Sequence, residues 1–239
     1  MLLRTAGAGV ALTDKWVTML KIMEDIVEIQ LSLFEAFIDL ICIDLRFVIG
    51  GVLLIGGTMY WLCKKNKSIA KFRMAITLIA LYYYLWVVLN RIVGFPTVKE
   101  FIRLSALGES LFNPNINLIP LVNGLNLEFI FNVFCFIPLG FLCPVLSKLY
   151  EQWEKILLIG LGLSLVIEIS QLFTLYRATD INDLIANVLG TALGYLCFKF
   201  ANKFRVVKSG VQVSSDDKSA CYLPIIYILS NMLLVLTQY

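Results

Sequence analysis

The chain has 239 residues, of which 59% are hydrophobic and 15% charged, with a formal net charge of +3 and a mean hydropathy of +0.84. Soluble domains carry about 45–50% apolar and about 25% charged residues, so this composition predicts an integral membrane protein with several spans. It excludes an intrinsically disordered chain, a disulfide-rich scaffold and a nucleic-acid-binding domain, and the absence of histidine excludes Ser-His or Cys-His nucleophile pairs and His-containing zinc sites.

Residues 1–46 predict a peripheral amphipathic helix. From Lys21 to Asp39 polar side chains recur at steps of three or four residues, which places them along one stripe of a helix with apolar residues opposite. Such a stripe is typical of an amphipathic helix. A central Asp costs roughly 2.5–3.5 kcal/mol in a membrane-spanning helix, so the acids in the stripe oppose spanning. We expect this helix to lie on the membrane surface or on the bundle.

Six segments approach the roughly 20 apolar residues that a membrane-spanning helix needs. They are residues 47–63, 74–93, 129–146, 156–175, 181–200 and 223–239. The sequence therefore predicts an all-α, polytopic transmembrane helix bundle of about six spans. Its predicted parts are the peripheral helix in 1–46, an extra first span with a basic loop in 47–73, and a main membrane domain in 74–239.

The basic residues predict how the bundle is oriented, because Lys and Arg concentrate in cytoplasmic loops. Loop 64–73 and stretch 199–208 are rich in Lys and Arg and contain no acid, whereas loops 96–128 and 176–180 are poor in net positive charge. We expect loops 64–73, 147–155 and 201–222 to be cytoplasmic, and loops 96–128 and 176–180 and both termini to face outward.

Polar side chains within membrane spans are costly and mostly mark functional sites. In the predicted topology, polar residues from three helices and the adjoining outer loops converge at the depth of the outer leaflet. These candidate site residues are Asn117, Asn132, Glu168, Gln171, Arg177, Asp180, Asp183 and Asn187. The sequence therefore predicts an outward-facing polar, acidic site. Two structural alternatives are a clamp in which Arg177 pairs with Asp180 or Asp183, and simple capping by Asp180 of the helix that follows it.

Two glycines continue the face that carries Asp183 and Asn187. Gly190 and Gly194 form a GxxxG pattern, which lets a second helix approach closely because neither residue has a side chain. We therefore expect both glycines to pack against another helix.

Four short motifs connect these residues to a known family. They read NLIPL at 117–121, NVFCFIPLGFL at 132–142, IEISQ at 167–171 and RATDINDLIANVLGTALG at 177–194. In their order and spacing the chain resembles the VanZ-like family over roughly residues 74–239, and residues 1–63 have no counterpart in short family members. The resemblance implies a multi-pass protein of the bacterial cytoplasmic membrane, and some members are associated with lowered sensitivity to lipoglycopeptide antibiotics of the teicoplanin type.

The first functional hypothesis is binding of a membrane lipid or a lipid-linked envelope headgroup at the outward site. A cationic or hydroxyl-rich headgroup would suit Glu168, Asp180 and Asp183, and antibiotic tolerance would follow indirectly from altered access to the cell surface. The lipoglycopeptide itself is another candidate partner. The sequence identifies no cofactor, no resident metal site and no nucleic-acid partner.

The alternative is a membrane enzyme that acts on a lipid-linked substrate. Glu168 would be the general acid or base. Burial in the membrane makes neighbouring carboxylates lose their protons at different pH values, so one can donate a proton while the other accepts one. Asp183 or Asp180 would hold the substrate or a divalent cation, with Asn187 as a further oxygen ligand. A transporter is disfavoured, since no inverted repeat is visible and the polar residues all lie on one side.

Overall fold

The computed structural model describes residues 44–65, 71–112, 114–120, 126–174, 179–204 and 221–238. The chain divides into two compact units, Met1–Ile43 and Asp44–Tyr239, and all of the described residues belong to the second unit. The predicted amphipathic stripe from Lys21 to Asp39 lies outside the described residues, and so does Arg177.

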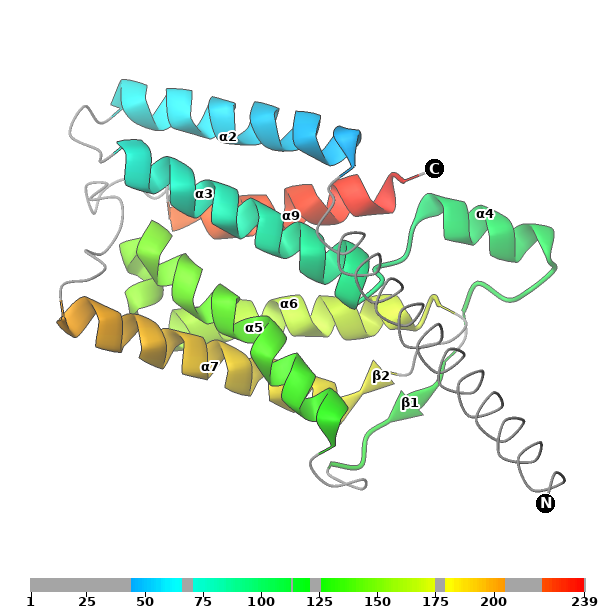
Figure 1. The fold of residues 1–239 in the computed structure, drawn as a ribbon. Coiled ribbons are helices and arrows are strands. Elements are labelled where there is room, and N and C mark those ends of the chain that lie inside the picture. The colour runs from blue at the N-terminus through cyan, green and yellow to red at the C-terminus, as the bar shows by residue number, and fades with distance from the viewer. Residues whose placement is uncertain are drawn as a thin grey trace, which may run out of the picture. The chain divides into compact units, whose positions relative to one another are not determined.

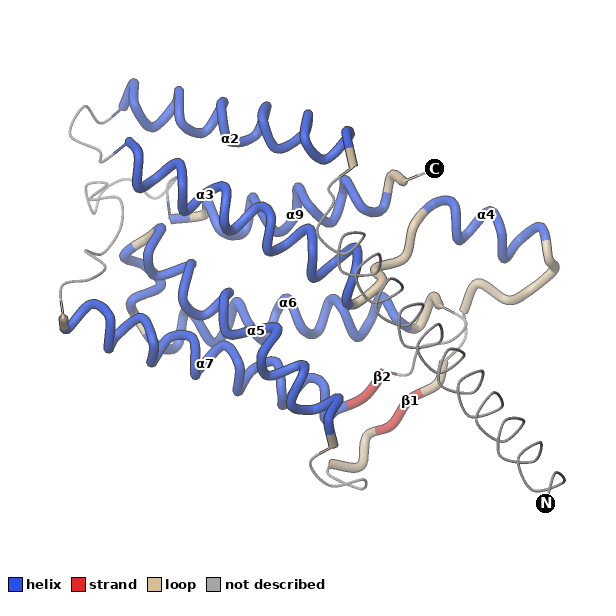
Figure 2. The backbone as a smooth tube through the Cα atoms, in the orientation of Figure 1, coloured by secondary structure: helices blue, strands red, loops and turns tan. Residues whose placement is uncertain are grey.

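The second unit is an all-α bundle, as the sequence predicts (Figures 1 and 2). Its long helices lie side by side, and a short helix and a two-stranded sheet sit at one end of the bundle. The elements are α2 (Leu45–Lys65), α3 (Lys71–Trp86), the π-helix η1 (Val87–Ile92), α4 (Val98–Ala106), β1 (Ile116–Asn117), α5 (Leu127–Leu146), the 3-10 helix η2 (Lys148–Glu151), α6 (Trp153–Gln171), β2 (Thr179–Asp180), α7 (Ile181–Lys203) and α9 (Leu223–Leu236).

The number of helices that qualify as membrane spans is smaller than the predicted six. Among the described residues four helices are long and apolar enough to cross a membrane, namely α2, α3 together with η1, α5 and α7. Helix α6 has 19 residues but includes Glu154, Lys155 and Glu168, and α9 has only 14 residues. Both lie in the bundle beside the longer helices (Figure 1). Charge in α6 and length in α9 therefore account for the difference.

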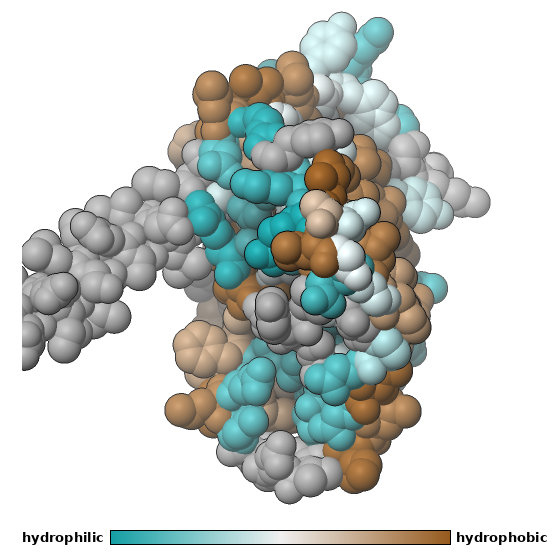
Figure 3. All heavy atoms as spheres, turned by 90° about the vertical axis from the view of Figure 1, so that its right-hand side faces the viewer, coloured by the Kyte–Doolittle hydropathy of each residue, from teal (hydrophilic) through white to brown (hydrophobic). Residues whose placement is uncertain are grey.

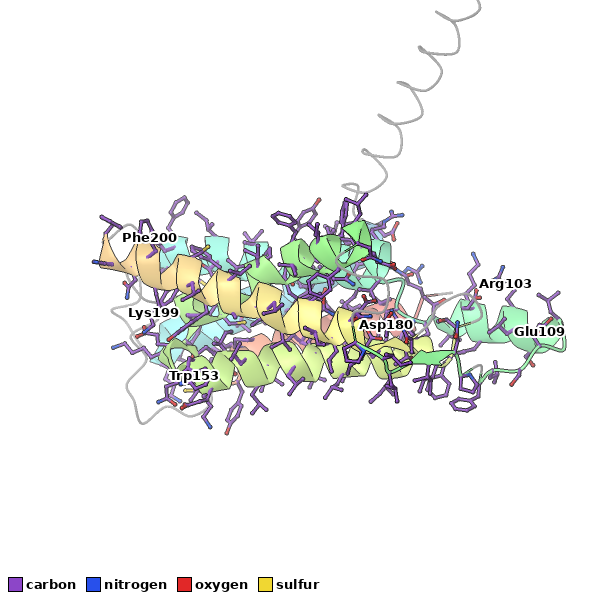
Figure 4. The ribbon with its side chains drawn as sticks, turned by 90° about the horizontal axis from the view of Figure 1, so that it is seen from below. Arg103, Glu109, Trp153, Asp180, Lys199 and Phe200 are labelled. Carbon is purple, nitrogen blue, oxygen red and sulfur yellow. The ribbon has the colours of Figure 1, made fainter. Side chains whose placement is uncertain are left out.

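Successive long helices run in opposite directions, so helix starts and helix ends alternate at each end of the bundle (Figure 1). We call the end where α2 and α7 finish the basic end. It carries the exposed basic residues Lys64, Lys65, Lys71, Arg73, Lys148, Lys155, Lys199 and Lys203. The opposite end, where α5 and α7 begin, has more acids than bases and is called the acidic end. Its exposed bases are Arg46, Lys99 and Arg103. Figure 4 shows Lys199 at the first end and Asp180 at the second.

The glycines of α7 bring its backbone against that of α5. A Cβ added to Gly190 would overlap the backbone carbonyl oxygen of Val133, and one added to Gly194 would overlap that of Ile137. From the α5 side, a Cβ on Gly140 would overlap the carbonyl oxygen of Thr191. Because the carbonyls belong to helix backbones, they cannot turn aside as a side chain would. Helix α5 therefore has one close, well-defined position against α7.

Candidate functional site

A small cavity lies at the acidic end, between the end of η1, the first turns of α5, the end of α6 and the first turns of α7. Its volume is about 50 Å³, which is room for a few water molecules. Three carboxylates and three side-chain amides line it. The lining residues are Ile92, Val93, Glu128, Asn132, Cys135, Phe136, Ile167, Glu168, Gln171, Asp183 and Asn187. The cavity is thus a polar site enclosed by apolar helices.

Glu168 is the innermost acid of this cavity. It lies one turn before the end of α6 and its side chain is only 4% exposed. One carboxylate oxygen, Oε2, accepts a hydrogen bond from the backbone N–H of Asp180 at 2.9 Å. The hydroxyl of Thr179 donates to the backbone carbonyl oxygen of Glu168 at 2.9 Å. Strand β2 therefore holds the end of α6, and with it the Glu168 carboxylate, in place.

Asp180 supports the site but does not line the cavity. Its Oδ1 accepts hydrogen bonds from the backbone N–H of Asn182 at 2.8 Å and from the Asn182 side-chain amide at 2.9 Å. This is the bonding of a helix N-cap, and Asp180 is the N-cap of α7. Its Oδ2 accepts from Nδ2 of Asn117 at 3.0 Å. Both carboxylate oxygens of Asp180 therefore accept hydrogen bonds from residues beside the cavity.

The two predicted loops at this end meet in a small parallel sheet. Strand β1 pairs with β2, with Ile116 opposite Thr179 and Asn117 opposite Asp180. The backbone N–H of Thr179 also donates to the carbonyl oxygen of Asn115 at 2.8 Å. Asn117, like Asp180, thus lies beside the cavity and joins the loop before α5 to the turn before α7.

Asn187 lies deepest on the α7 side of the cavity. Its side chain is 4% exposed, and its Nδ2 donates to the hydroxyl of Ser164 in α6 at 2.9 Å. Its Oδ1 is buried and has no hydrogen-bond partner among the described residues. Buried acceptors in folded proteins nearly always have a partner, and Oδ1 of Asn231, which does not line the cavity, is also buried without one among the described residues.

Most predicted site residues therefore come together, but in two layers. Asn132, Glu168, Gln171, Asp183 and Asn187 line the cavity, whereas Asn117 and Asp180 form the hydrogen-bonded support beside it. The described residues do not include Arg177, so its pairing with Asp180 or Asp183 stays a prediction. Among the described residues no group of three or more His, Cys, Asp or Glu side chains is placed to hold a metal ion.

Sequence reasoning missed two parts of the cavity. Glu128 precedes Asn132 by four residues on α5, and both line the cavity. The helical spacing that grouped Glu168 with Gln171 would also have found Glu128. The other missed part is the wall formed by Ile92 and Val93 at the end of η1. A π-helix has no comparable sequence signal, although such turns are frequent at functional sites.

The bundle consists of long apolar helices that enclose a polar cavity at one end. With the family match described next, these helices show that the chain is a membrane protein. A family model described as VanZ/LLP1 matches residues 74–202, more than half of the chain, and the chain belongs to this family. The match runs from α3 to the end of α7, so it contains the whole cavity but stops before α9, which the sequence resemblance had included. No curated protein and no solved structure matches the chain.

Proposed function

We propose that the protein is a multi-pass protein of the bacterial cytoplasmic membrane, whose cavity faces outward and binds the headgroup of a lipid or a lipid-linked envelope component. The cavity itself is the observation that carries this proposal. Its polar lining comes from α5, α6 and α7, and these helices otherwise expose large apolar side chains such as Leu127, Phe131 and Ile169. A site with a polar interior and apolar flanks suits a molecule that is itself half polar and half apolar.

The charge distribution supports the outward orientation. Eight exposed lysines and arginines lie at the basic end, opposite the cavity, against three (Arg46, Lys99 and Arg103) at the acidic end (Figures 1 and 4), and cytoplasmic ends of membrane proteins are rich in such residues. Figure 3, which looks onto the acidic end, has hydrophilic residues gathered on that face and hydrophobic residues along the sides. The cavity would then open toward the outer leaflet.

Labelling of single cysteines in intact cells tests the orientation. In a cysteine-free background, a membrane-impermeant thiol reagent should label Glu109→Cys, because Glu109 is exposed at the acidic end. It should label Asn66→Cys only after the cells are permeabilised. Labelling of Asn66→Cys in intact cells would reverse the proposed orientation.

The position of Glu128 indicates how a headgroup reaches the cavity. Glu128 lies in the first turn of α5 and is exposed, while Glu168 and Asn187 behind it are buried. The acids thus extend from the surface of the bundle to its interior. A headgroup at the membrane surface can enter along this line while its acyl chains stay beside the exposed apolar side chains Phe131 and Leu127.

Lowered lipoglycopeptide susceptibility would be a consequence of this binding. We propose that retention of an envelope lipid or lipid-linked precursor changes what an antibiotic of the teicoplanin type meets at the membrane surface. The phenotype should then depend on Glu168 and Asp183, since these carboxylates line the cavity. Cells producing Glu168→Gln or Asp183→Asn should be as susceptible as cells without the protein, at equal amounts of membrane-inserted protein.

The decisive experiment measures bound lipid directly. The protein is purified in nanodiscs made from bacterial membrane lipids, and retained lipids are counted by native mass spectrometry. Glu168→Gln and Asp183→Asn should lose most of the retained lipid. Glu154→Gln is the matched control, because Glu154 is an exposed acid in the same helix at the basic end. Equal lipid retention in all of these proteins would refute headgroup binding at the cavity.

A membrane enzyme is the second candidate, and one observation favours it. Glu168 and Asp183 line the same cavity but differ in burial, since Glu168 is buried and Asp183 is half-buried. Two carboxylates in different surroundings can divide the roles of general acid and general base. A change in an envelope lipid or precursor that disappears with Glu168→Ala would support turnover. An unchanged set of envelope components would leave binding as the function.

A further inference from the structure

A second opening lies between α2 and α9, away from the polar cavity. It is a groove of about 360 Å³ that is lined by five residues of α2 and two of α9. The lining residues are Leu53, Leu54, Gly57, Thr58, Trp61, Leu223 and Ile226. Both helices lie outside residues 74–202, so the groove is a feature that this chain has in addition to the matched family segment.

The polar groups of the groove do not require a polar occupant. Of the lining residues Thr58 is the one with a hydroxyl. This hydroxyl donates to the backbone carbonyl oxygen of Leu54 at 2.9 Å and lies 2.9 Å from the hydroxyl of Tyr227, with which it shares a hydrogen bond. Trp61 is the lining residue of α2 nearest the basic end, and tryptophan is enriched where membrane helices meet lipid headgroups. Hydrocarbon can therefore fill the groove without leaving the Thr58 hydroxyl unpaired.

One end of the groove adjoins two lysines. Lys64 and Lys65 are the last residues of α2 and follow Trp61 by three and four residues, so they continue the helix face that carries Gly57 and Trp61. The ammonium of Lys65 lies 5.1 Å from the centre of the Trp61 ring. Neither α2 nor α9 contains an acidic residue. The groove is thus apolar along its length and positively charged at its end.

An anionic phospholipid has the complementary arrangement, with an apolar chain joined to a negatively charged headgroup. The lining from Leu53 to Trp61 extends about 12 Å along α2, at ~1.5 Å per residue, and ends on the side where the headgroups of one leaflet lie. The chain's own segment 205–220, which precedes α9, is a poorer match because it is polar and carries Asp216 and Asp217. Charge and polarity therefore favour a lipid as the occupant.

We propose that the groove between α2 and α9 holds an acyl chain of an anionic phospholipid from the leaflet at the basic end, with its phosphate beside Lys64 and Lys65. The lysines donate charge-assisted hydrogen bonds to the phosphate oxygens. This lipid site lies apart from the cavity at the acidic end and does not depend on the proposed function. The bound lipid fills the space between α2 and α9.

Native mass spectrometry tests the inference. The protein is reconstituted into nanodiscs that contain equal amounts of phosphatidylglycerol, which is anionic, and phosphatidylcholine, which has no net charge, and the lipids retained by each chain are counted. Phosphatidylglycerol should be preferred by about tenfold or more, because each lysine near an anionic headgroup contributes about fivefold. Glu168→Gln should keep this preference, since Glu168 lines the cavity at the other end of the bundle.

Gly57→Phe is the diagnostic variant for the groove. A Cβ added to Gly57 would meet no atom within 4 Å, so a larger side chain has room at this position without displacing a helix. The variant should lose the preference for phosphatidylglycerol and keep its thermal unfolding midpoint. Gly56→Phe is the matched control, because a Cβ there also meets no atom within 4 Å but Gly56 does not line the groove. Ile226→Trp, which narrows the groove from α9, should reproduce the loss.

A pair of lysine variants tests the position of the headgroup. Lys64→Gln combined with Lys65→Gln should bring the retention of the two lipids close to equal. Lys199→Gln combined with Lys203→Gln is the matched control and should keep the preference. These lysines are exposed at the same end of the bundle, but they belong to α7, which lies on the opposite side of the bundle from α2 (Figure 1).

Four outcomes would overturn the inference. Equal retention of phosphatidylglycerol by Gly57→Phe and Gly56→Phe would place the lipid elsewhere. An equal loss of preference in the two lysine pairs would mean that the general charge of the basic end attracts the lipid. A dimer that Gly57→Phe converts to a monomer would mean that a second copy covers the groove. A lower unfolding midpoint in Gly57→Phe but not in Gly56→Phe would mean that another part of the chain fills it.

Discussion

Two glycine-rich helices of this protein, α7 and α2, behave differently in the bundle. Gly190 and Gly194 of α7 lie directly against the backbone of α5, whereas a Cβ at Gly56 or Gly57 of α2 would meet no atom within 4 Å. Within its apolar window α7 is 33% buried and α2 only 17%. Glycines in apolar helices therefore differ in what they face: another backbone in α7, no atom at Gly56 and Gly57, and the side chains of Leu234 and Tyr82 at Gly50 and Gly51 of α2.

The same division separates the helices around the cavity from those outside the family match. Helices α5, α6 and α7 lie within residues 74–202 and are joined by backbone contacts and buried polar hydrogen bonds. Helices α2 and α9 lie outside that segment and are joined by the hydroxyls of Thr58 and Tyr227, 2.9 Å apart. Close packing also occurs outside the family segment, because a Cβ on Gly51 of α2 would lie 2.7 Å from the ring of Tyr82, but there the neighbour is a side chain and not a helix backbone.

The largest effect is expected from bulk at the α5–α7 contact. Gly194→Leu should prevent the two backbones from approaching and should destabilise the protein by about 3 kcal/mol or more, at the upper end of overpacking effects. Gly56→Leu in α2 should leave stability nearly unchanged. Accumulation in membranes and the thermal unfolding midpoint check both variants. Similar stability of the two would show that the close contact of α7 with α5 is not required.

The next effect concerns charge within the cavity. Asp183→Asn preserves shape and most hydrogen bonds, so the protein should stay folded while headgroup retention falls about tenfold or more. Native mass spectrometry and thermal unfolding, measured on the same preparation, check this expectation. A stable Asp183→Asn protein with full retention would make the carboxylate a structural clamp and defeat the site hypothesis.

Asp180 should respond in the opposite way to Asp183. Asp180→Ala removes the N-cap of α7 and the bond to Asn117, and loss of a cap costs about 0.5–2 kcal/mol. We expect a lower unfolding midpoint with most headgroup retention preserved in the folded fraction. Asn117→Ala should lower stability less, since it leaves the bonds from Asn182 intact. Loss of binding without loss of stability in Asp180→Ala would move Asp180 into the cavity lining.

The smallest effect is expected outside the family segment. Tyr227→Phe removes the hydroxyl that joins α9 to Thr58 of α2 and should cost about 0.5–1.5 kcal/mol, with no change in headgroup retention. Tyr60→Phe is the control, because Tyr60 is 72% exposed. A loss of retention in Tyr227→Phe would show that α2 and α9 help to shape the cavity.

The helical class, the basic end of the bundle and the pairs of polar residues that share a helix face can all be predicted from the sequence. These properties depend on composition and on the 3.6-residue period, both of which are local. Gln171 and Glu168 fall on one face for this reason, as do Asp183 and Asn187, and the structure places all four at one cavity.

Which of these residues line the cavity and which lie beside it depends on contacts between distant parts of the chain. Asp180 is turned away by its bond to Asn117, 63 residues earlier in the chain, and no local pattern encodes a bond over that separation. The role of each glycine likewise depends on whether another backbone lies opposite, as it does for Gly190 but not for Gly56. Long-range contacts, rather than helix period, therefore separate the cavity from its support, because they alone bring distant segments within hydrogen-bonding distance.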